Sequence, residues 1–316
     1  MWPWRRNTGG DGLTSVVFGP DRVTIASVNR RSGERPQVRV CESFAREGSE
    51  LDALKRLRGR YLGRAICTTL LNHGQYQLLQ LEAPSVPPEE VANALRWRVK
   101  DMVDFPVTQA GVDALPIPTE PAPGRPPQVH AVVASHGVLT PIVRMFQAAK
   151  VHLDVIDIPE LAQRNLATLF ETERRALAFL AFDEGGGRLT FNYGGELCVS
   201  RHIEATSTAL ARSSDDPGGL FERVLLDVQR SLDNFDRNYS AVTLSRLLVA
   251  PVPGAEGFAG YLKSNLYQTV EPLDLSAGLD LDAVPKLADP AQQAPMLLAI
   301  GAALREATAT GGGKAR

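Results

Sequence analysis

Short runs of β-branched and other apolar residues, separated by turn residues, dominate the first 80 positions of the chain. Gly19-Pro20-Asp21 separates the first two runs, and Asn72-His73-Gly74 separates the last two, as expected for tight turns. One short helix, Glu50–Leu57, interrupts the series. The strands predicted from this pattern are Thr14–Phe18, Arg22–Val28, Val38–Phe44, Ala65–Leu70 and Tyr76–Leu81.

The proline-rich stretch 83–88 ends the strand pattern, and helical spacing follows it. Val91, Leu95 and Val99 recur every fourth residue, which predicts an amphipathic helix that stops at Asp104-Phe105-Pro106. Strands and helices then alternate around an exposed, proline-rich loop at 118–127. The elements predicted here are the strands Val112–Ile117, Val129–Ser135 and Leu153–Ile158 and the helices Leu139–Lys150 and Leu161–Phe170.

The second half of the chain repeats the opening pattern from Ala176 onward. Three glycines, 185–187, separate its first two strands, and the longest amphipathic helix keeps one apolar face from Phe221 to Tyr239. The other elements predicted here are the strands Ala176–Phe182, Arg188–Tyr193, Glu196–Ile203, Arg246–Ala250 and Thr269–Leu273 and the helices Gly257–Leu266 and Pro295–Glu306.

Both halves therefore have the order strand, strand, strand, helix, strand, helix. Two βββαβα units that face each other across a cleft make up the actin-like ATPase (ASKHA) fold, so the pattern predicts an α/β protein of this class. The two halves share no obvious residue identity, so the repeat is one of topology. We expect lobe 2 at 173–307 and a disordered tail at 308–316.

Composition excludes several classes of protein. The 316 residues are 44% apolar and 22% charged, enough chain for two domain-sized units without disulfides. The formal net charge of -2 argues against a nucleic-acid binder. Three widely spaced cysteines indicate reduced thiols in the cytosol, and the five histidines lack metal-binding spacing, so no metal site is predicted. No apolar stretch is long enough to span a membrane, and the N-terminus lacks the apolar core of a secretory signal.

Basic residues concentrate in and after the first predicted helix. Either they form a solvated helix face, or they face anionic lipid or an acidic partner together with the arginines near the N-terminus. These residues are Lys55, Arg56, Arg58, Arg60 and Arg64.

One segment is distinctive. Ala94–Val107 resembles the helix-to-Phe-Pro segment of the PilM family of type IV pilus assembly proteins, and it is most similar to the MshI type associated with mannose-sensitive agglutinin (MSHA) pili. Val112–Pro116, Val155–Ala162 and Gln229–Phe235 resemble further segments of the family. The likeness extends over roughly residues 12–306, and the cytoplasmic domain of the type II secretion protein GspL is a relative.

The resemblance implies a cytoplasmic scaffold that is peripheral to the inner face of the inner membrane through its partner. It also implies an inserted subdomain in lobe 1, at 86–151, with lobe 1 itself at 1–85 and 152–172. In the family, a groove beside the inserted subdomain holds the cytoplasmic N-terminal peptide of a bitopic PilN-like protein. The candidate groove residues here are Leu95, Trp97, Arg98, Val99 and Phe105. Trp97 falls off the apolar face of its helix, so it either caps the groove or covers a neighbouring strand. The resemblance leaves open whether the chain self-associates and which pilus or secretion system it serves.

Actin-like ATPases hold the phosphates of ATP in two glycine hairpins, each with a carboxylate that positions magnesium and water. In the first hairpin, at Gly19, Val17 stands where the family has Asp, and Pro20 lacks an N–H donor. The second hairpin keeps Asp183, although its glycine-rich turn needs no ligand to explain it. The glycines of the second hairpin are Gly185, Gly186 and Gly187.

The adenosine region is altered as well. Pro251 and Pro253 stand where glycines would let the base and ribose approach, while Gly301 either contacts nucleotide or marks close helix packing. We therefore expect no catalytic residues and no cofactor. The alternative is a nucleotide-binding, ATP-switched assembly protein in which Asp183 aids magnesium binding. A sugar kinase has less support, because no catalytic base is apparent.

Overall fold

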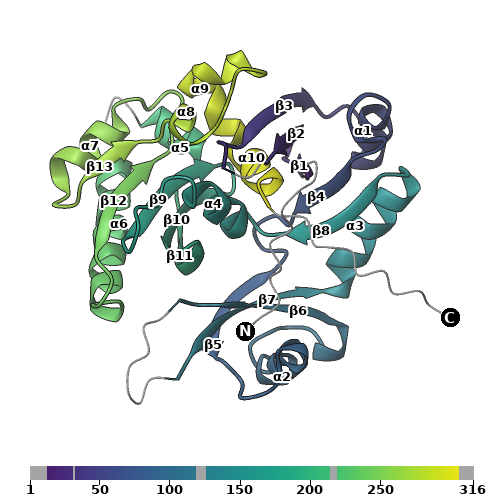
Figure 1. The fold of residues 1–316 in the computed structure, drawn as a ribbon, viewed down its shortest axis with the longest axis horizontal. Helices are drawn as coiled ribbons and strands as arrows, with labels where there is room; N and C mark the ends of the chain where they lie inside the picture. Colours follow the sequence, from purple (N-terminus) through teal and green to yellow (C-terminus); the bar gives the residue numbers. More distant parts are fainter. Residues whose placement is uncertain (1–12, 31–32, 119–125, 214–218, 306–316) are drawn as a thin grey trace.

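The computed structural model describes residues 13–30, 33–118, 126–213 and 219–305. The tail predicted to be disordered, 308–316, lies outside the described residues, as do positions 119–125 of the proline-rich loop. The described chain forms two five-stranded sheets and one three-stranded sheet. Figure 1 shows the two larger sheets side by side, with the smaller sheet below them.

The first lobe is a mixed sheet with two helices packed on it. Its elements are β1 (Thr14–Phe18), β2 (Arg22–Asn29), β3 (Gln37–Ala45), α1 (Glu50–Leu57) with its continuation η1 (Arg58–Leu62), β4 (Ile66–Leu70), α3 (His136–Ala148) and β8 (His152–Asp157). The strand order is β3-β2-β1-β4-β8. α1 begins at a capping box in which Ser49 and Asp52 satisfy each other's backbone N–H groups. Phe146 of α3 packs edge-on against Phe18, with 6.4 Å between the ring centroids.

The second lobe repeats this arrangement. Its elements are β9 (Ala176–Asp183), β10 (Gly186–Tyr193), β11 (Glu196–Ile203), α5 (Ser207–Arg212), α6 (Leu220–Asn238), β12 (Leu244–Val249), α7 (Phe258–Asn265) and β13 (Val270–Pro272). The strand order is β11-β10-β9-β12-β13. β9 is central, and every side chain from Ala176 to Phe182 is buried. The apolar face of α6 covers one side of the sheet, where Phe235 stacks on Phe191 at 4.6 Å between ring centroids.

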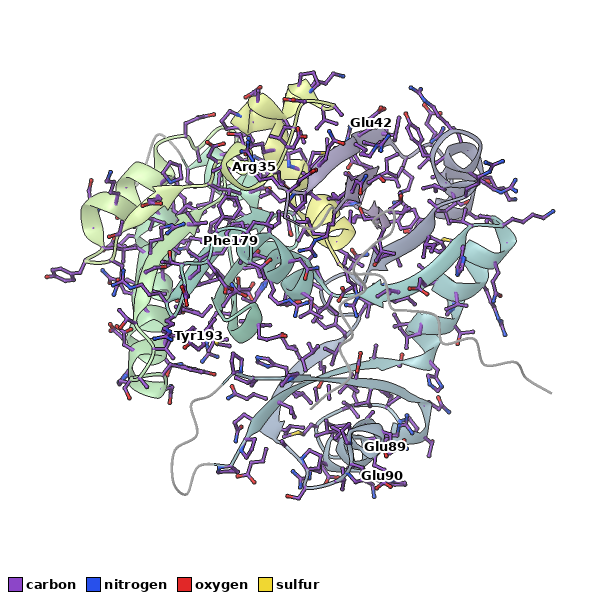
Figure 2. The ribbon with its side chains drawn as sticks, in the orientation of Figure 1. Arg35, Glu42, Glu89, Glu90, Phe179 and Tyr193 are labelled. Atoms are coloured by element: carbon purple, nitrogen blue, oxygen red, sulfur yellow. The ribbon has the colours of Figure 1, made fainter. Side chains whose placement is uncertain are left out.

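Two helices lie between the lobes and join them. α4 (Pro159–Ala167) packs against β9, β10 and β11, and α10 (Leu297–Ala303) packs against α4, β1 and β2. The hydrophobic core around these helices takes side chains from both lobes, including the fully buried Phe179 labelled in Figure 2. Short elements precede α10: α8 (Leu275–Gly278), η4 (Pro285–Ala288), α9 (Pro290–Gln293) and η5 (Ala294–Met296).

The inserted subdomain is a three-stranded antiparallel sheet covered on one face by a helix. Its elements are β5 (Gln77–Glu82), η2 (Pro88–Glu90), α2 (Val91–Arg98), η3 (Val107–Gln109), β6 (Ala110–Pro116) and β7 (Gln128–Ser135), and the strand order is β5-β7-β6. α2 ends earlier than predicted, and turns carry the chain on to Phe105. Glu89 and Glu90 mark the outer end of this subdomain in Figure 2.

The strand pairing differs from the division expected at residues 86 and 151. β5, expected in lobe 1, pairs with β7 over six residues and so belongs to the inserted sheet. α3, expected in the insertion, contributes Phe146 to the core of lobe 1, and Ala149 just after the helix joins it there. The insertion therefore runs from about β5 to the end of β7. The expected bounds differ because chain order alone does not say which strands pair.

Candidate functional site

The first glycine hairpin is closed by its own backbone. The Gly19 N–H donates to the Arg22 carbonyl at 2.8 Å, and the Arg46 guanidinium donates to the Pro20 carbonyl. Val17, at the position where the family has Asp, packs against a small apolar cluster of Leu70, Ala162 and Ala302, as does Leu298 of α10. Apolar packing between lobe 1 and the helices that join the lobes thus occupies the place of a magnesium-positioning carboxylate.

The second hairpin uses its carboxylate to hold its own turn. Asp183 accepts a hydrogen bond from Gly185 N at 2.6 Å with one oxygen and from the Arg188 guanidinium at 3.2 Å with the other. A Cβ on Gly186, whose φ is +120°, would lie 2.4 Å from the His202 ring, and one on Gly187 would lie 2.5 Å from the Phe182 ring. Close packing inside the lobe therefore accounts for these two glycines without a ligand.

The cavity that Asp183 shares with α10 is small, although the Asp183 side chain is itself 36% exposed. A cavity of about 20 Å³ remains there, lined by Asp183, Arg188 and Gln163 on one side and by Leu297 and Leu298 of α10 on the other. Sites for small molecules usually have volumes of about 300–1,000 Å³, whereas one water needs only about 10–15 Å³. This cavity has room for water but not for a nucleotide phosphate with its magnesium ion, so the residues present do not fit that ligand here.

The insertion closes the same region from below. Tyr76, just before β5, donates a hydrogen bond to the Glu160 carboxylate of α4 at 2.5 Å. Burial and the neighbouring Glu160 carboxylate raise the pKa of Tyr76, so the phenol stays protonated as a donor. His73, from the turn after β4, stacks on His202 of β11 with 4.3 Å between ring centroids. Lobe 1, lobe 2 and the insertion thus meet through direct side-chain contacts.

Gly301 lies at the crossing of α4 and α10. A Cβ at this position would lie 2.1 Å from the Ala162 carbonyl oxygen, and the Asn165 side-chain amide donates to the Gly301 carbonyl at 2.9 Å. Gly301 therefore permits close contact of the two helices that join the lobes. Of the two roles considered from the sequence, the structure supports helix packing.

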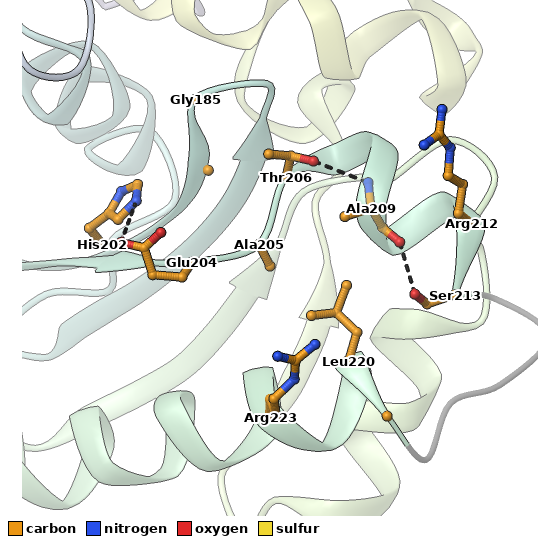
Figure 3. Close-up of a pocket in the computed structure, with 12 residues that line it drawn as sticks. Gly185, His202, Glu204, Ala205, Thr206, Ala209, Arg212, Ser213, Leu220 and Arg223 are labelled. Atoms are coloured by element: carbon orange, nitrogen blue, oxygen red, sulfur yellow. Dashed lines mark hydrogen bonds and ion pairs between the residues drawn. The ribbon is translucent and has the colours of Figure 1, made fainter.

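The second lobe has a larger pocket beside its glycine hairpin. It holds about 630 Å³ and lies between Gly185–Gly186, the end of β11, α5 and the start of α6 (Figure 3). Arg212 and Arg223 line it together with Glu204, whose carboxylate lies 3.6 Å from His202. With two arginines and the N-terminal end of the 19-residue helix α6, the pocket has the electrostatics of an anion site.

Three of the expected groove residues form the core of the insertion instead. Leu95 and Val99 are fully buried between α2 and the sheet, and Phe105 packs against the same cluster. α2 covers the sheet face formed by alternate residues of β7, and the opposite face turns toward the two lobes. The expectation that these three side chains contact a peptide is therefore not supported, because they are already packed against the insertion's own strands.

Trp97 and Arg98 lie on the outer surface of the insertion. The Trp97 side chain is 65% exposed, and the Arg98 guanidinium donates to the Glu82 carbonyl at 2.9 Å. Trp97 neither caps a groove nor covers a strand among the described residues. The apolar spacing of α2 showed which of its residues face inward, but not that its own sheet covers that face.

Half-buried apolar side chains lie between the insertion and lobe 1. They are Val132 of β7 in the insertion, and Leu139 and Ile142 of α3 and Ile156 of β8 in lobe 1, and we call this set the β8 junction. β8 is the outermost strand of its sheet, so one of its edges has no strand partner within the described ranges. The sequence already indicated that the insertion has a second covered face, because β7 is apolar at consecutive positions and must be covered on both faces.

Two further observations bear on membrane and metal. No helix among the described residues is long and apolar enough to cross a membrane. Nor do three or more His, Cys, Asp or Glu side chains of the described chain come together in a way that would hold a metal ion.

Known proteins resemble this chain in structure rather than in sequence. Neither a protein-family model nor a curated protein sequence matches it. Among solved structures it is similar to one described as the PilM-PilN type IV pilus biogenesis complex, with a TM-score of 0.71 and 19% identity over 94% of this chain and 99% of that chain. It is also similar to the cytoplasmic domain of EpsL, an inner-membrane component of the type II secretion system of Vibrio cholerae (TM-score 0.45, 14% identity, 76% of this chain and 83% of that one).

A third similar structure is a protein of unknown function with an actin-like ATPase fold from Bacteroides thetaiotaomicron (TM-score 0.48, 9% identity, 88% of this chain and 96% of that one). The chain has the mixed α/β actin-like ATPase fold predicted from its sequence. It consists of two mixed five-stranded sheets with an inserted three-stranded sheet.

Proposed function

We propose that this chain is a non-catalytic scaffold of type IV pilus assembly that binds an extended N-terminal peptide of a PilN-like inner-membrane protein. The β8 junction carries the proposal, because an unpaired strand edge beside half-buried apolar side chains suits an added peptide strand. The similarity in fold to the PilM of a PilM-PilN complex, over nearly the whole of both chains, supports the same kind of partner.

The finer parts of the proposal rest on the sequence. The likeness of Ala94–Val107 to MshI-type proteins favours an MSHA-type pilus, and the partner's membrane anchor would place the chain at the inner face of the inner membrane. Deleting the gene should then remove surface pili of the MSHA type. Fractionation of cells that lack the PilN-like protein should shift this chain from the membrane fraction to the soluble fraction.

Peptide binding tests the scaffold directly. We expect Ile142→Glu to weaken calorimetric binding of the PilN-like N-terminal peptide at least about tenfold, since it places a carboxylate among half-buried apolar groups. Val143→Glu is the matched control, because Val143 is adjacent on α3 but 38% exposed. Equal losses in both variants, or none in either, would argue against the β8 junction as the peptide site.

We also propose that the chain does not hydrolyse ATP. Val17 packs against an apolar cluster that includes Ala162 and Ala302, Asp183 is engaged by its own hairpin, and the cavity between Asp183 and α10 is about 20 Å³. Purified protein should release no phosphate from Mg-ATP above an Asp183→Ala control. A release rate that depends on Asp183 would contradict this part of the proposal while leaving peptide binding untouched.

A second candidate function keeps nucleotide as a bound switch. The pocket of about 630 Å³ beside Gly185–Gly186, with Arg212 and Arg223 in its lining, favours it. Millimolar Mg-ATP would stabilise a micromolar binder by about 4 kcal/mol, which a thermal melt detects easily. A shift in melting temperature that disappears in Arg223→Ala would support the nucleotide switch. No shift in the wild type would contradict the switch and leave the non-catalytic scaffold as the proposed function.

A further inference from the structure

A second groove lies between the insertion and lobe 2. It holds about 590 Å³ and is lined by Leu78–Gln80 of β5 and Val199–Arg201 of β11, and we call it the β5–β11 groove. β11 is the outermost strand of its sheet within the described residues. Successive side chains of a strand point to opposite faces, so lining by three consecutive residues indicates that the groove runs along the edge of β11, whose outward N–H and C=O groups have no strand partner in the described chain. Gln128 and His130 of β7, which pairs with β5, also line the groove, so on the insertion side it runs over a face of the sheet.

A β-bulge shapes the inner end of this groove. Phe191 pairs with Val199 and Asn192 with Leu197, which leaves Cys198 as an extra residue in β11. The Cys198 carbonyl accepts a hydrogen bond from the Tyr239 hydroxyl at 3.1 Å and lies 3.2 Å from His130 Nε2. The bulge thus turns a backbone acceptor of lobe 2 toward the insertion.

His130 leaves one polar atom of the groove without a partner. When Nε2 carries the proton that is donated to Cys198, Nδ1 is an acceptor. The side chain is only 4% exposed, and Nδ1 has no hydrogen-bond partner in the described part of the chain. A buried acceptor without a partner costs folding free energy, and a ligand N–H would remove that cost.

The walls that the described residues give the groove are polar, and the charged side chain among them is basic. Gln80, Gln128 and Ser200 offer side-chain groups with no hydrogen-bond partner among the described residues. Arg201 is exposed, and within the described ranges it forms no ion pair and no acidic residue lines the groove with it. This lining suits an extended backbone that carries a carboxylate near Arg201.

We propose that the β5–β11 groove receives an extended segment of a partner polypeptide, which pairs with a strand edge, donates an N–H to His130 Nδ1 and places a carboxylate at Arg201. The site is separate from the β8 junction, which lies between lobe 1 and the insertion. It goes beyond the proposed function, because it gives the scaffold a second strand-addition site that contacts lobe 2.

Selection from a library of random twelve-residue peptides displayed on phage tests the groove. Selected peptides should carry an acidic residue and should bind Arg201→Glu at least about tenfold more weakly than the wild type. Lys263→Glu is the matched control, since it makes the same charge change at an exposed position on α7 and should leave affinity unchanged. His130→Leu should weaken binding about fivefold, with the fold checked by circular dichroism.

Backbone pairing has its own readout. Methylating single backbone nitrogens along a selected peptide should abolish binding at alternate positions, because only every second N–H of an added strand faces a given edge. The proposal is overturned if no peptide is enriched, if Arg201→Glu binds like the wild type, or if no methylated position matters. It is also overturned if the PilN-like peptide displaces the selected peptides, which would assign the groove to the partner already proposed.

Discussion

His130 should make the stability of this protein depend on pH below 7. Burial lowers the pKa of His130 from 6.5 to about 4, against a weaker opposing contribution from the carbonyls it faces. As pH falls from about 6.5 to about 4, the unfolded chain takes up a proton that the folded chain does not. The free energy of unfolding therefore has its full value with respect to His130 above pH 6.5, and it decreases as pH falls toward 4. At 1.36 kcal/mol per pH unit, the interval from 6.5 to about 4 corresponds to about 3 kcal/mol.

Urea unfolding at pH 7 and pH 4.5 measures this loss. The wild type should lose about 2–3 kcal/mol more than a His130→Gln variant between these pH values. Gln does not titrate, and its amide can still donate to the Cys198 carbonyl. Both proteins share the carboxylates elsewhere in the chain, so the difference between them removes the contribution of those carboxylates. The His130 ring proton should also keep its neutral chemical shift at pH 5.5 in an NMR titration. Equal losses in the two proteins, or a midpoint near 6.5 for His130, would refute the buried neutral imidazole.

Three further predictions follow from packing. Gly301→Val should destabilise the fold by about 3 kcal/mol or more in urea titrations, because its Cβ would meet the Ala162 carbonyl. Gly260→Ala, in open space on α7, should change stability by less than about 1 kcal/mol. Similar values for both would contradict the close helix crossing. Trp97→Ala should shift stability by no more than about 0.5 kcal/mol and leave peptide affinity unchanged, so a measurable affinity loss would return Trp97 to the binding site. The buried Cys67 and Cys198, whose thiol pKa values are raised chiefly by burial, should react with a thiol reagent at pH 8 only after denaturant is added, and fast labelling of either in native protein would contradict its burial.

Periodicity predicted the elements well but not their partners. The uninterrupted apolar run at Ala176–Phe182 is typical of a strand covered on both faces, and it is the central strand β9. The spacing from Phe221 to Tyr239 likewise became α6. β5, however, was predicted to belong with the strands that precede it, because pairing with a strand about 50 residues later produces no pattern in the local sequence. Only the pairing register shows that it belongs to the insertion.

The candidate sites show the same limit. The sequence showed the loss of a carboxylate at Val17, and the structure adds that this side chain packs against an apolar cluster that includes Ala162 and Ala302. The sequence could not show that the inward face of α2 is covered by its own sheet, so that Leu95 and Val99 are not available to the expected groove. The amphipathic pattern of a helix indicates that one of its faces is buried, but it does not indicate which element covers that face. Nor could residue spacing predict that His73 stacks on His202 or that His130 lies beside the Cys198 carbonyl, since each pair joins segments of different subdomains.

These contacts give the proposed scaffold a physical rationale. In a nucleotide-switched protein, a ligand between two lobes makes contacts that differ between an open and a closed state. Here protein groups make the contacts that join the lobes: Val17 packs against the cluster of Leu70, Ala162 and Ala302, Tyr76 donates to Glu160, and Gly301 lies against Ala162. A packed helix crossing is not continuously deformable, so lobes joined in this way hold their relative position without a ligand. A strand edge keeps its affinity for a peptide only if the side chains beside it stay in place, and contacts between the lobes secure both the β8 junction and the β5–β11 groove in this way.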